Sequence, residues 1–167
     1  MIKLNIEVES SIGIDMTEKV RIKKMLGLIP TKIAQSLIDK EYTIRINNHK
    51  NMNRGTGGFY NKVNKLICLR AYFESYVLYH EIGHFVDMEN KYVSAFSDTQ
   101  LFLEIYAQEK RSLDKFIKYG VPLYRHCIET THEYFAQSFA HYILYGEQLK
   151  EYAPYTHKFI SRCIEII

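Results

Sequence analysis

The chain of 167 residues contains no run of eighteen apolar residues, the length that a membrane-spanning helix needs. Its first residues, 1–5, also lack the apolar segment of a signal peptide. These absences predict that the chain has no membrane partner and that, as given, it is cytoplasmic. Secretion is the alternative if a leader has been removed.

Cysteine is scarce and the net charge is small. The three cysteines, Cys68, Cys127 and Cys163, are odd in number and form no CxxC pair. That pattern favours buried free thiols in a reducing compartment over a disulfide framework. A net charge of +3 is too small to indicate nucleic acid or a membrane surface as a partner. The chain also shows no internal repeat and no low-complexity segment.

Core-forming residues, by contrast, are plentiful. The chain is 47% hydrophobic and 25% charged, values that are typical of a globular protein. Fourteen tyrosines and nine phenylalanines supply large side chains for a core. The length predicts one domain over residues 1–167, and we expect a monomer.

The first half of the chain alternates between strand and helix patterns. Alternating apolar and polar residues predict strands at residues 2–8 and 42–46, and we expect a further strand at 66–70 after a turn at 61–65. Between the first two, we expect one helix that Asp15 or Thr17 caps and Gly27 stops, and a second that begins at Pro30.

From residue 74 onward the pattern is almost entirely helical. We expect helices at residues 74–90, 97–118 and 129–145, the last stopped by Gly146, and a final helix from Pro154. Strands followed by helices indicate an α+β fold. The small antiparallel or mixed sheet would lie in the N-terminal half, and the C-terminal half would be helical.

The motif His-Glu-x-x-His stands in the middle of the chain, inside the predicted helix 74–90. Residues four apart lie on one face of a helix, so His80 and His84 point the same way and offer two corners of a tetrahedral zinc site. Glu81 lies beside them, where a carboxylate can take a proton from a metal-bound water. Gly83 lets another backbone or the metal environment approach closely.

A catalytic zinc takes three protein ligands, so a third must come from elsewhere in the chain. Glu133 is the best candidate, because apolar neighbours at 134, 135 and 139 would pack its helix against the core. His132 and Glu129 are rivals. The alternative is that Glu133 is an ordinary solvated helix glutamate.

A glycine-rich segment precedes the strand 66–70. Gly57, Gly58, Phe59 and Tyr60 fit a strand edge at which another backbone can approach closely. A peptidase could hold an extended substrate along such an edge by β-augmentation. An ordinary hairpin loop is the alternative.

Two segments, 76–87 and 133–139, resemble the anthrax-lethal-factor-like zinc metallopeptidases, and they are also similar to the related bacterial Pro-Pro endopeptidases. The resemblance implies a zincin-like fold with the active helix in the middle. It also implies a gluzincin site with zinc on His80, His84 and Glu133 and with Glu81 as the general base. Looser similarity places the family's substrate-binding edge at 57–60 and its closing amphipathic helix at 153–167.

The chain departs from the family pattern at two positions. The family has a tyrosine seven residues before its glutamate ligand, and its hydroxyl stabilises the oxyanion. Here that position is His126, so Tyr124, nine residues before Glu133, is our candidate, with Tyr119 and His126 as alternatives.

The second departure is Gln137, where the lethal factor pattern has an acidic residue that holds a ligand imidazole. A glutamine oxygen can still accept that hydrogen bond. Asp87 is an alternative acceptor, unless it is only a surface aspartate.

The function predicted from these residues is that of a zinc-dependent endopeptidase, with one catalytic Zn²⁺ and a peptide or protein substrate. One alternative keeps the enzyme class but makes it an intracellular regulatory protease that cuts a specific repressor-type protein. The other is a zinc-containing protein-binding module that has lost catalysis.

Overall fold

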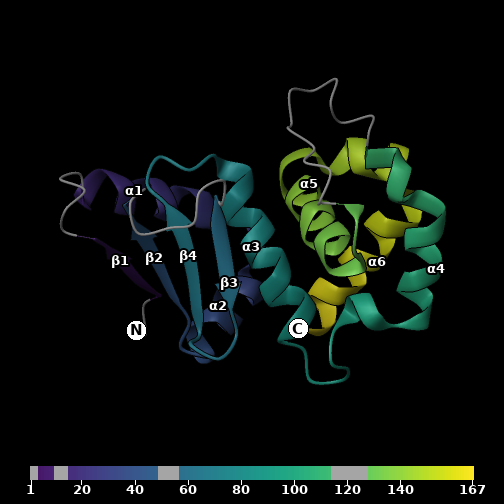
Figure 1. Cartoon of the computed structure of the whole chain (residues 1–167), viewed down its shortest axis with the longest axis horizontal. Helices are drawn as coiled ribbons and strands as arrows, with labels where there is room; N and C mark the ends of the chain where they lie inside the picture. The colour runs from purple at the N-terminus through teal and green to yellow at the C-terminus, as the bar shows by residue number, and fades with distance from the viewer. Residues whose placement is uncertain (1–3, 10–14, 49–56, 114–127) are drawn as a thin grey trace.

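The computed structural model describes residues 4–9, 15–48, 57–113 and 128–167 (Figure 1). Figure 1 shows a sheet on one side, a group of helices on the other, and helix α3 between them. The predicted α+β fold is confirmed. The elements are β1 (Asn5–Val8), α1 (Asp15–Leu26), α2 (Thr31–Asp39), β2 (Thr43–Asn47), β3 (Gly58–Asn61), β4 (Leu66–Arg70), α3 (Ser75–Met88), the 3-10 helix η3 (Phe96–Asp98), α4 (Gln100–Glu109), α5 (Thr131–Tyr152) and α6 (Pro154–Ile166).

The sheet is mixed, with the strand order β1-β2-β4-β3. β1 and β4 each run parallel to β2, whereas β3 runs antiparallel to β4. Alternate residues of the two central strands are fully buried and form the floor of the core: Ile44, Ile46, Ile67 and Leu69. β3 is therefore an edge strand with one side unpaired among the described strands, and it lies next to α3.

Helix α3 is buried over most of its length, because apolar side chains surround it on more than one face. Its fully or nearly buried apolar residues are Val77, Leu78, Ile82, Phe85 and Val86. Gly83 lies where α3 meets α5. A Cβ atom at this position would stand 2.7 Å from Cα of Ala136 and 2.8 Å from its carbonyl oxygen, so the two helices meet backbone to backbone.

One predicted helix in the C-terminal half is wrong and another is interrupted where it was expected to stop. The helix expected from 97 is divided, because Thr99 caps a new helix by accepting a hydrogen bond from the Phe102 N–H, and α4 then ends at Glu109. Residues 114–118 of that prediction lie outside the described residues. The helix expected at 129–145 leaves helical geometry at Tyr145, where φ is −143° and ψ is 46°, and α5 resumes beyond this kink to Tyr152.

The last helix begins at Pro154, as predicted, and α4 supplies its cap. The buried carboxylate of Glu109 accepts hydrogen bonds from the backbone N–H groups of Tyr155 and Thr156 at 3.1 and 2.8 Å. Cys68 and Cys163 are buried free thiols, in agreement with the prediction, and Cys127 lies outside the described residues. Within the described ranges, no helix is both long enough and apolar enough to cross a membrane.

Candidate active site

Three predicted ligand residues meet between α3 and the first turn of α5. His80 Nε2 lies 3.2 Å from one carboxylate oxygen of Glu133, and His84 Nε2 lies 3.5 Å from the other. The ligand atoms of these three residues all lie within 4.8 Å of one another, and no other such group occurs among the described residues. Two imidazoles and a carboxylate form a donor set that suits zinc.

Local structure explains why Glu133 faces α3. Thr130 caps α5 and accepts a hydrogen bond from the Glu133 N–H at 3.2 Å, which fixes the first turn. The rival ligands lie elsewhere: His132 contacts Asp87 and Asp98, and Glu129 is exposed. Glu133 is therefore the third member that the geometry favours.

The two histidines have opposite electrostatic environments. Burial and the neighbouring His80 lower the pKa of His84 to about 4, so its imidazole is neutral at pH 7. Burial also acts to lower the pKa of His80, but its hydrogen bond with Glu133 and the charges of Glu81 and Glu133 raise it overall. Because a metal ion competes with protons for the same lone pairs, this cluster of buried bases beside a carboxylate fits a cation.

Glu81 lies next to the ligand group and is 6% exposed. Burial raises its pKa to about 7, with His80 opposing the rise and Glu133 adding to it. A carboxylate with a pKa near the working pH can both accept and return a proton. Strand β3 packs directly on this side chain, since a Cβ on Gly58 would stand 3.1 Å from Cγ of Glu81.

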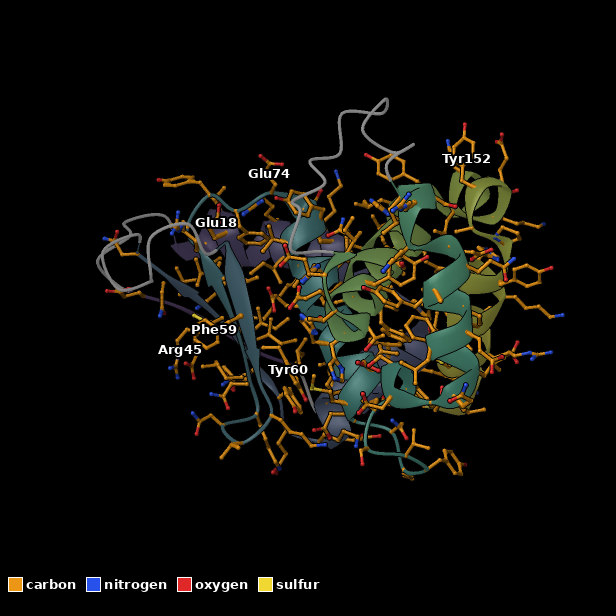
Figure 2. All side chains as sticks on the ribbon, turned by 45° about the vertical axis from the view of Figure 1, so that its right-hand side comes forward. Glu18, Arg45, Phe59, Tyr60, Glu74 and Tyr152 are labelled. Atoms are coloured by element: carbon orange, nitrogen blue, oxygen red, sulfur yellow. The ribbon has the colours of Figure 1, made fainter. Side chains whose placement is uncertain are left out.

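A cavity of about 890 Å³ opens over these residues. Its walls are β3, the turn after β4, the exposed side of α3 and the first turns of α5. All four residues of the predicted substrate edge line it: Gly57, Gly58, Phe59 and Tyr60. Figure 2 shows Tyr60 on the side of the sheet that faces the helices.

Tyr60 is fixed at the junction of β3 and α3. Its hydroxyl lies 2.9 Å from the hydroxyl of Tyr42 and donates to Glu89 at 3.2 Å, while its ring stacks beside that of His84 at 6.4 Å. Glu89 also binds Lys40 at 3.1 Å. Sequence reasoning missed Tyr42 and Glu89, because their partners are distant in the chain.

The two predicted supporting residues have different positions. Gln137 Oε1 lies 3.2 Å from His80 Nδ1, where the prediction put it. The fully buried Asp87 accepts hydrogen bonds from the N–H and hydroxyl of Ser97 at 2.7 and 2.6 Å, and it lies 3.1 Å from His132. Asp87 therefore connects α3 to η3 and α5 and does not accept a hydrogen bond from His84. Within the described ranges, His84 Nδ1 has no hydrogen-bond partner.

The candidates for oxyanion stabilisation, Tyr124, Tyr119 and His126, lie outside the described residues. Their role stays a prediction. Sequence reasoning also missed His141, which is fully buried behind Gln137. The sequence could have indicated it, because a residue four positions after Gln137 lies on the same face of the helix.

The family comparison agrees with this arrangement. Residues 70–163 match the model of the family "Anthrax toxin lethal factor, N- and C-terminal domain". The chain belongs to this family, and it is a relative of the lethal-factor-like metallopeptidases.

Among solved structures, the Pro-Pro endopeptidase PPEP-2 from Paenibacillus alvei shares the fold. The match has a TM-score of 0.65 at 20% sequence identity and covers 88% of this chain and 91% of that one. No curated protein matches the chain.

Proposed function

We propose that the chain is a zinc-dependent endopeptidase that hydrolyses peptide bonds in a peptide or protein substrate. The observation that supports this most strongly is the convergence of His80, His84 and Glu133 beside the buried Glu81, beneath a cavity edged by β3. A protein that only held a metal would have no use for a buried carboxylate that stands next to the ligands and is not one of them.

In the proposed reaction, His80, His84 and Glu133 would hold the ion. Zinc bound there would supply Lewis-acid chemistry, polarising the scissile carbonyl and lowering the pKa of water. Glu81 takes the proton of the attacking water and passes it to the nitrogen of the leaving amine. Burial of Glu81, which raises the pKa of its carboxyl, supports this role in proton transfer.

The unpaired side of β3 would hold the substrate as an added strand. An edge strand offers backbone N–H and C=O groups to an extended peptide, which places the scissile bond at a fixed position along the strand. Gly57 and Gly58 let the strand approach α3 closely enough for this peptide to lie over Glu81. Tyr124 is our candidate for the donor that stabilises the developing negative charge.

The proposal is tested with a quenched-fluorescence peptide library and a zinc assay on the same protein. We expect one zinc per wild-type chain and cleavage of a subset of peptides. Glu81→Gln should keep the zinc and lose at least roughly 100-fold in kcat/KM, which is the smallest usual contribution of general base catalysis. Glu151→Gln, an exposed carboxylate at the far end of α5, should behave as wild type.

A Glu81→Gln protein that cleaves as fast as wild type would refute the mechanism. A zinc-loaded wild type that binds peptides without cleaving any would support the protein-binding module instead.

A further inference from the structure

Three buried polar groups form a line from the metal-ligating group into the core. His80 Nδ1 lies 3.2 Å from Gln137 Oε1, and Gln137 Nε2 lies 3.3 Å from His141 Nε2. Gln137 and His141 are both fully buried and stand one turn apart on α5. His141 is not among the residues that line the cavity, so the proposed reaction leaves it without a role.

The amide of Gln137 creates a requirement that a carboxylate would not. Both oxygens of a carboxylate accept hydrogen bonds, so either end can receive the Nδ1–H of a ligand histidine. An amide has one accepting end and one donating end. If the NH₂ end faced His80, Nδ1 would have to accept, and the ring proton of neutral His80 would move to Nε2, the atom that faces Glu133.

Such a ring could not bind a metal through Nε2, because a protonated nitrogen has no free lone pair. The direction of the Gln137 amide therefore decides whether neutral His80 is ready to act as a ligand. Metal-ligating histidines usually have this tautomer fixed by a hydrogen bond to the other ring nitrogen. Here the partner of His80 Nδ1 is the Gln137 amide, which could present either its oxygen or its NH₂ group to that nitrogen.

His141 stands at the other end of this amide. Its Nε2 lies 3.3 Å from the amide nitrogen of Gln137, while the amide oxygen lies 3.2 Å from His80 Nδ1. Burial lowers the pKa of His141 to about 3, so its imidazole is neutral and has one accepting and one donating nitrogen. In this arrangement Nε2 accepts from the amide N–H and the ring proton of His141 lies on Nδ1.

We propose that His141 is a positioning residue that orients the Gln137 amide and thereby keeps the proton of His80 on Nδ1 and the lone pair on Nε2. The inference rests on the metal site of the proposed function, but not on peptide hydrolysis. His141 acts through Gln137 and touches neither substrate nor metal. If it were only a packing residue, its removal would change stability alone.

A double-mutant cycle on zinc affinity tests this role. Zinc dissociation constants are measured by competition with a chromophoric chelator for wild type, His141→Leu, Gln137→Glu and the double variant. We expect His141→Leu to weaken zinc binding about 10-fold in the wild-type background, within the usual range for residues behind a ligand. With Glu at 137 the same substitution should change affinity less than about 2-fold, because a carboxylate needs no orientation.

His141→Gln is the matched control, since its side-chain oxygen can still accept from the Gln137 amide. It should bind zinc within about 3-fold of wild type if accepting the hydrogen bond is what matters. Equal losses for His141→Leu in both backgrounds, or no loss in either, would overturn the proposal. Melting curves of the metal-free proteins separate a loss of affinity from a loss of folding.

The tautomers themselves can be observed in the zinc-loaded wild type, where His80 Nε2 would hold the ion in place of a proton. Long-range ¹⁵N–¹H correlation spectra at pH 8 should show His141 with its proton on Nδ1 and His80 with its proton on Nδ1. A proton on Nε2 of His141 would overturn the proposal even if His141→Leu failed to fold. A chain that shows the expected tautomers and zinc coupling but cleaves no peptide would refute the peptidase proposal and leave this one intact.

Discussion

The two walls of the cavity differ in how firmly they are held. The helical wall, α3 and α5, carries His80, Glu81, His84 and Glu133, and its backbones touch at Gly83. The opposite wall is β3, whose only partner among the described strands is β4. Phe59, in the middle of that strand, is 40% exposed.

This difference matches what each wall is proposed to do. Groups that bind a metal and transfer a proton have to stay within about 0.5 Å of their working positions. A strand that receives a peptide needs unpaired backbone groups and room on its free side. In this proposal a closely packed wall carries the chemistry and an open wall receives the peptide, so substitutions on the two walls should have different effects.

The largest effect is expected when a ligand on the helical wall is removed. His80→Ala should weaken zinc binding by more than about 100-fold, beyond the range for residues that only support a ligand. Peptide hydrolysis should be lost with the metal. His157→Ala, a histidine on α6 that stacks on Tyr142, is the control and should keep both. Chelator competition measures the affinity, and retention of wild-type affinity in His80→Ala would refute the assigned ligand.

Gly83→Ala tests the helix crossing itself. The added methyl would stand 2.7 Å from the backbone of Ala136, which cannot move aside as a side chain would. We expect a loss of about 1–3 kcal/mol in the free energy of unfolding, the usual cost of overpacking, together with weaker zinc binding. Urea denaturation measures the free energy of unfolding, and chelator competition measures zinc affinity.

Gly146→Ala supplies the matched control, because its Cβ would meet nothing within 4 Å. There the better helix propensity of alanine should leave stability unchanged or raise it by up to about 1 kcal/mol. Equal responses at the two glycines would contradict the backbone contact.

A smaller effect is expected where the two walls meet. Gly58→Ala would place a methyl 2.9 Å from the carbonyl oxygen of Cys68 and 3.1 Å from Cγ of Glu81. Because this displaces Glu81, the proposed general base, kcat should fall by roughly 10-fold, while zinc affinity stays near that of wild type. Gly57→Ala meets only the side chain of Val77, at 3.2 Å, and should change kcat less. The reverse order would refute the packing of β3 on Glu81.

The smallest change is expected from Tyr60→Phe on the strand wall. It removes a hydroxyl that bonds to Tyr42 and Glu89 but keeps the ring beside His84. The free energy of unfolding should fall by about 0.5–1.5 kcal/mol, the usual net value of a hydrogen bond. Urea denaturation measures this change. Tyr92→Phe, at a tyrosine that is 69% exposed, should leave the free energy of unfolding unchanged in the same measurement.

Much of the helical wall was predictable because its pattern is local. The spacing of His80 and His84 and the apolar residues around them define α3 within two residues of its observed ends. Strand 66–70 was likewise predicted at its observed bounds, since five residues with buried apolar members lie between clear turn signals. The order of strands and helices predicted the α+β class but left open whether the sheet is antiparallel or mixed, and the structure shows that it is mixed.

What escaped prediction depends on contacts between distant residues. The helical segment that follows the kink at Tyr145 and carries α5 on to Tyr152 was not predicted. The helix predicted from 97 breaks because Thr99 caps a new one, and a threonine in a helical pattern gives no sign of that choice. The clusters around Asp87 and Glu89 are formed by tertiary packing.

The crossing of Gly83 and Ala136 also has a mechanical consequence. Glu133 lies three residues from Ala136, or about 4.5 Å along α5, whereas the kink at Tyr145 lies nine residues away, or roughly 14 Å. The contact therefore fixes α5 close to its ligand-bearing end. By geometry alone, a small tilt of α5 about this contact would displace Tyr145 about three times as far as Glu133. Changes at the distal end of the helix would thus alter the distances among the three ligand atoms least.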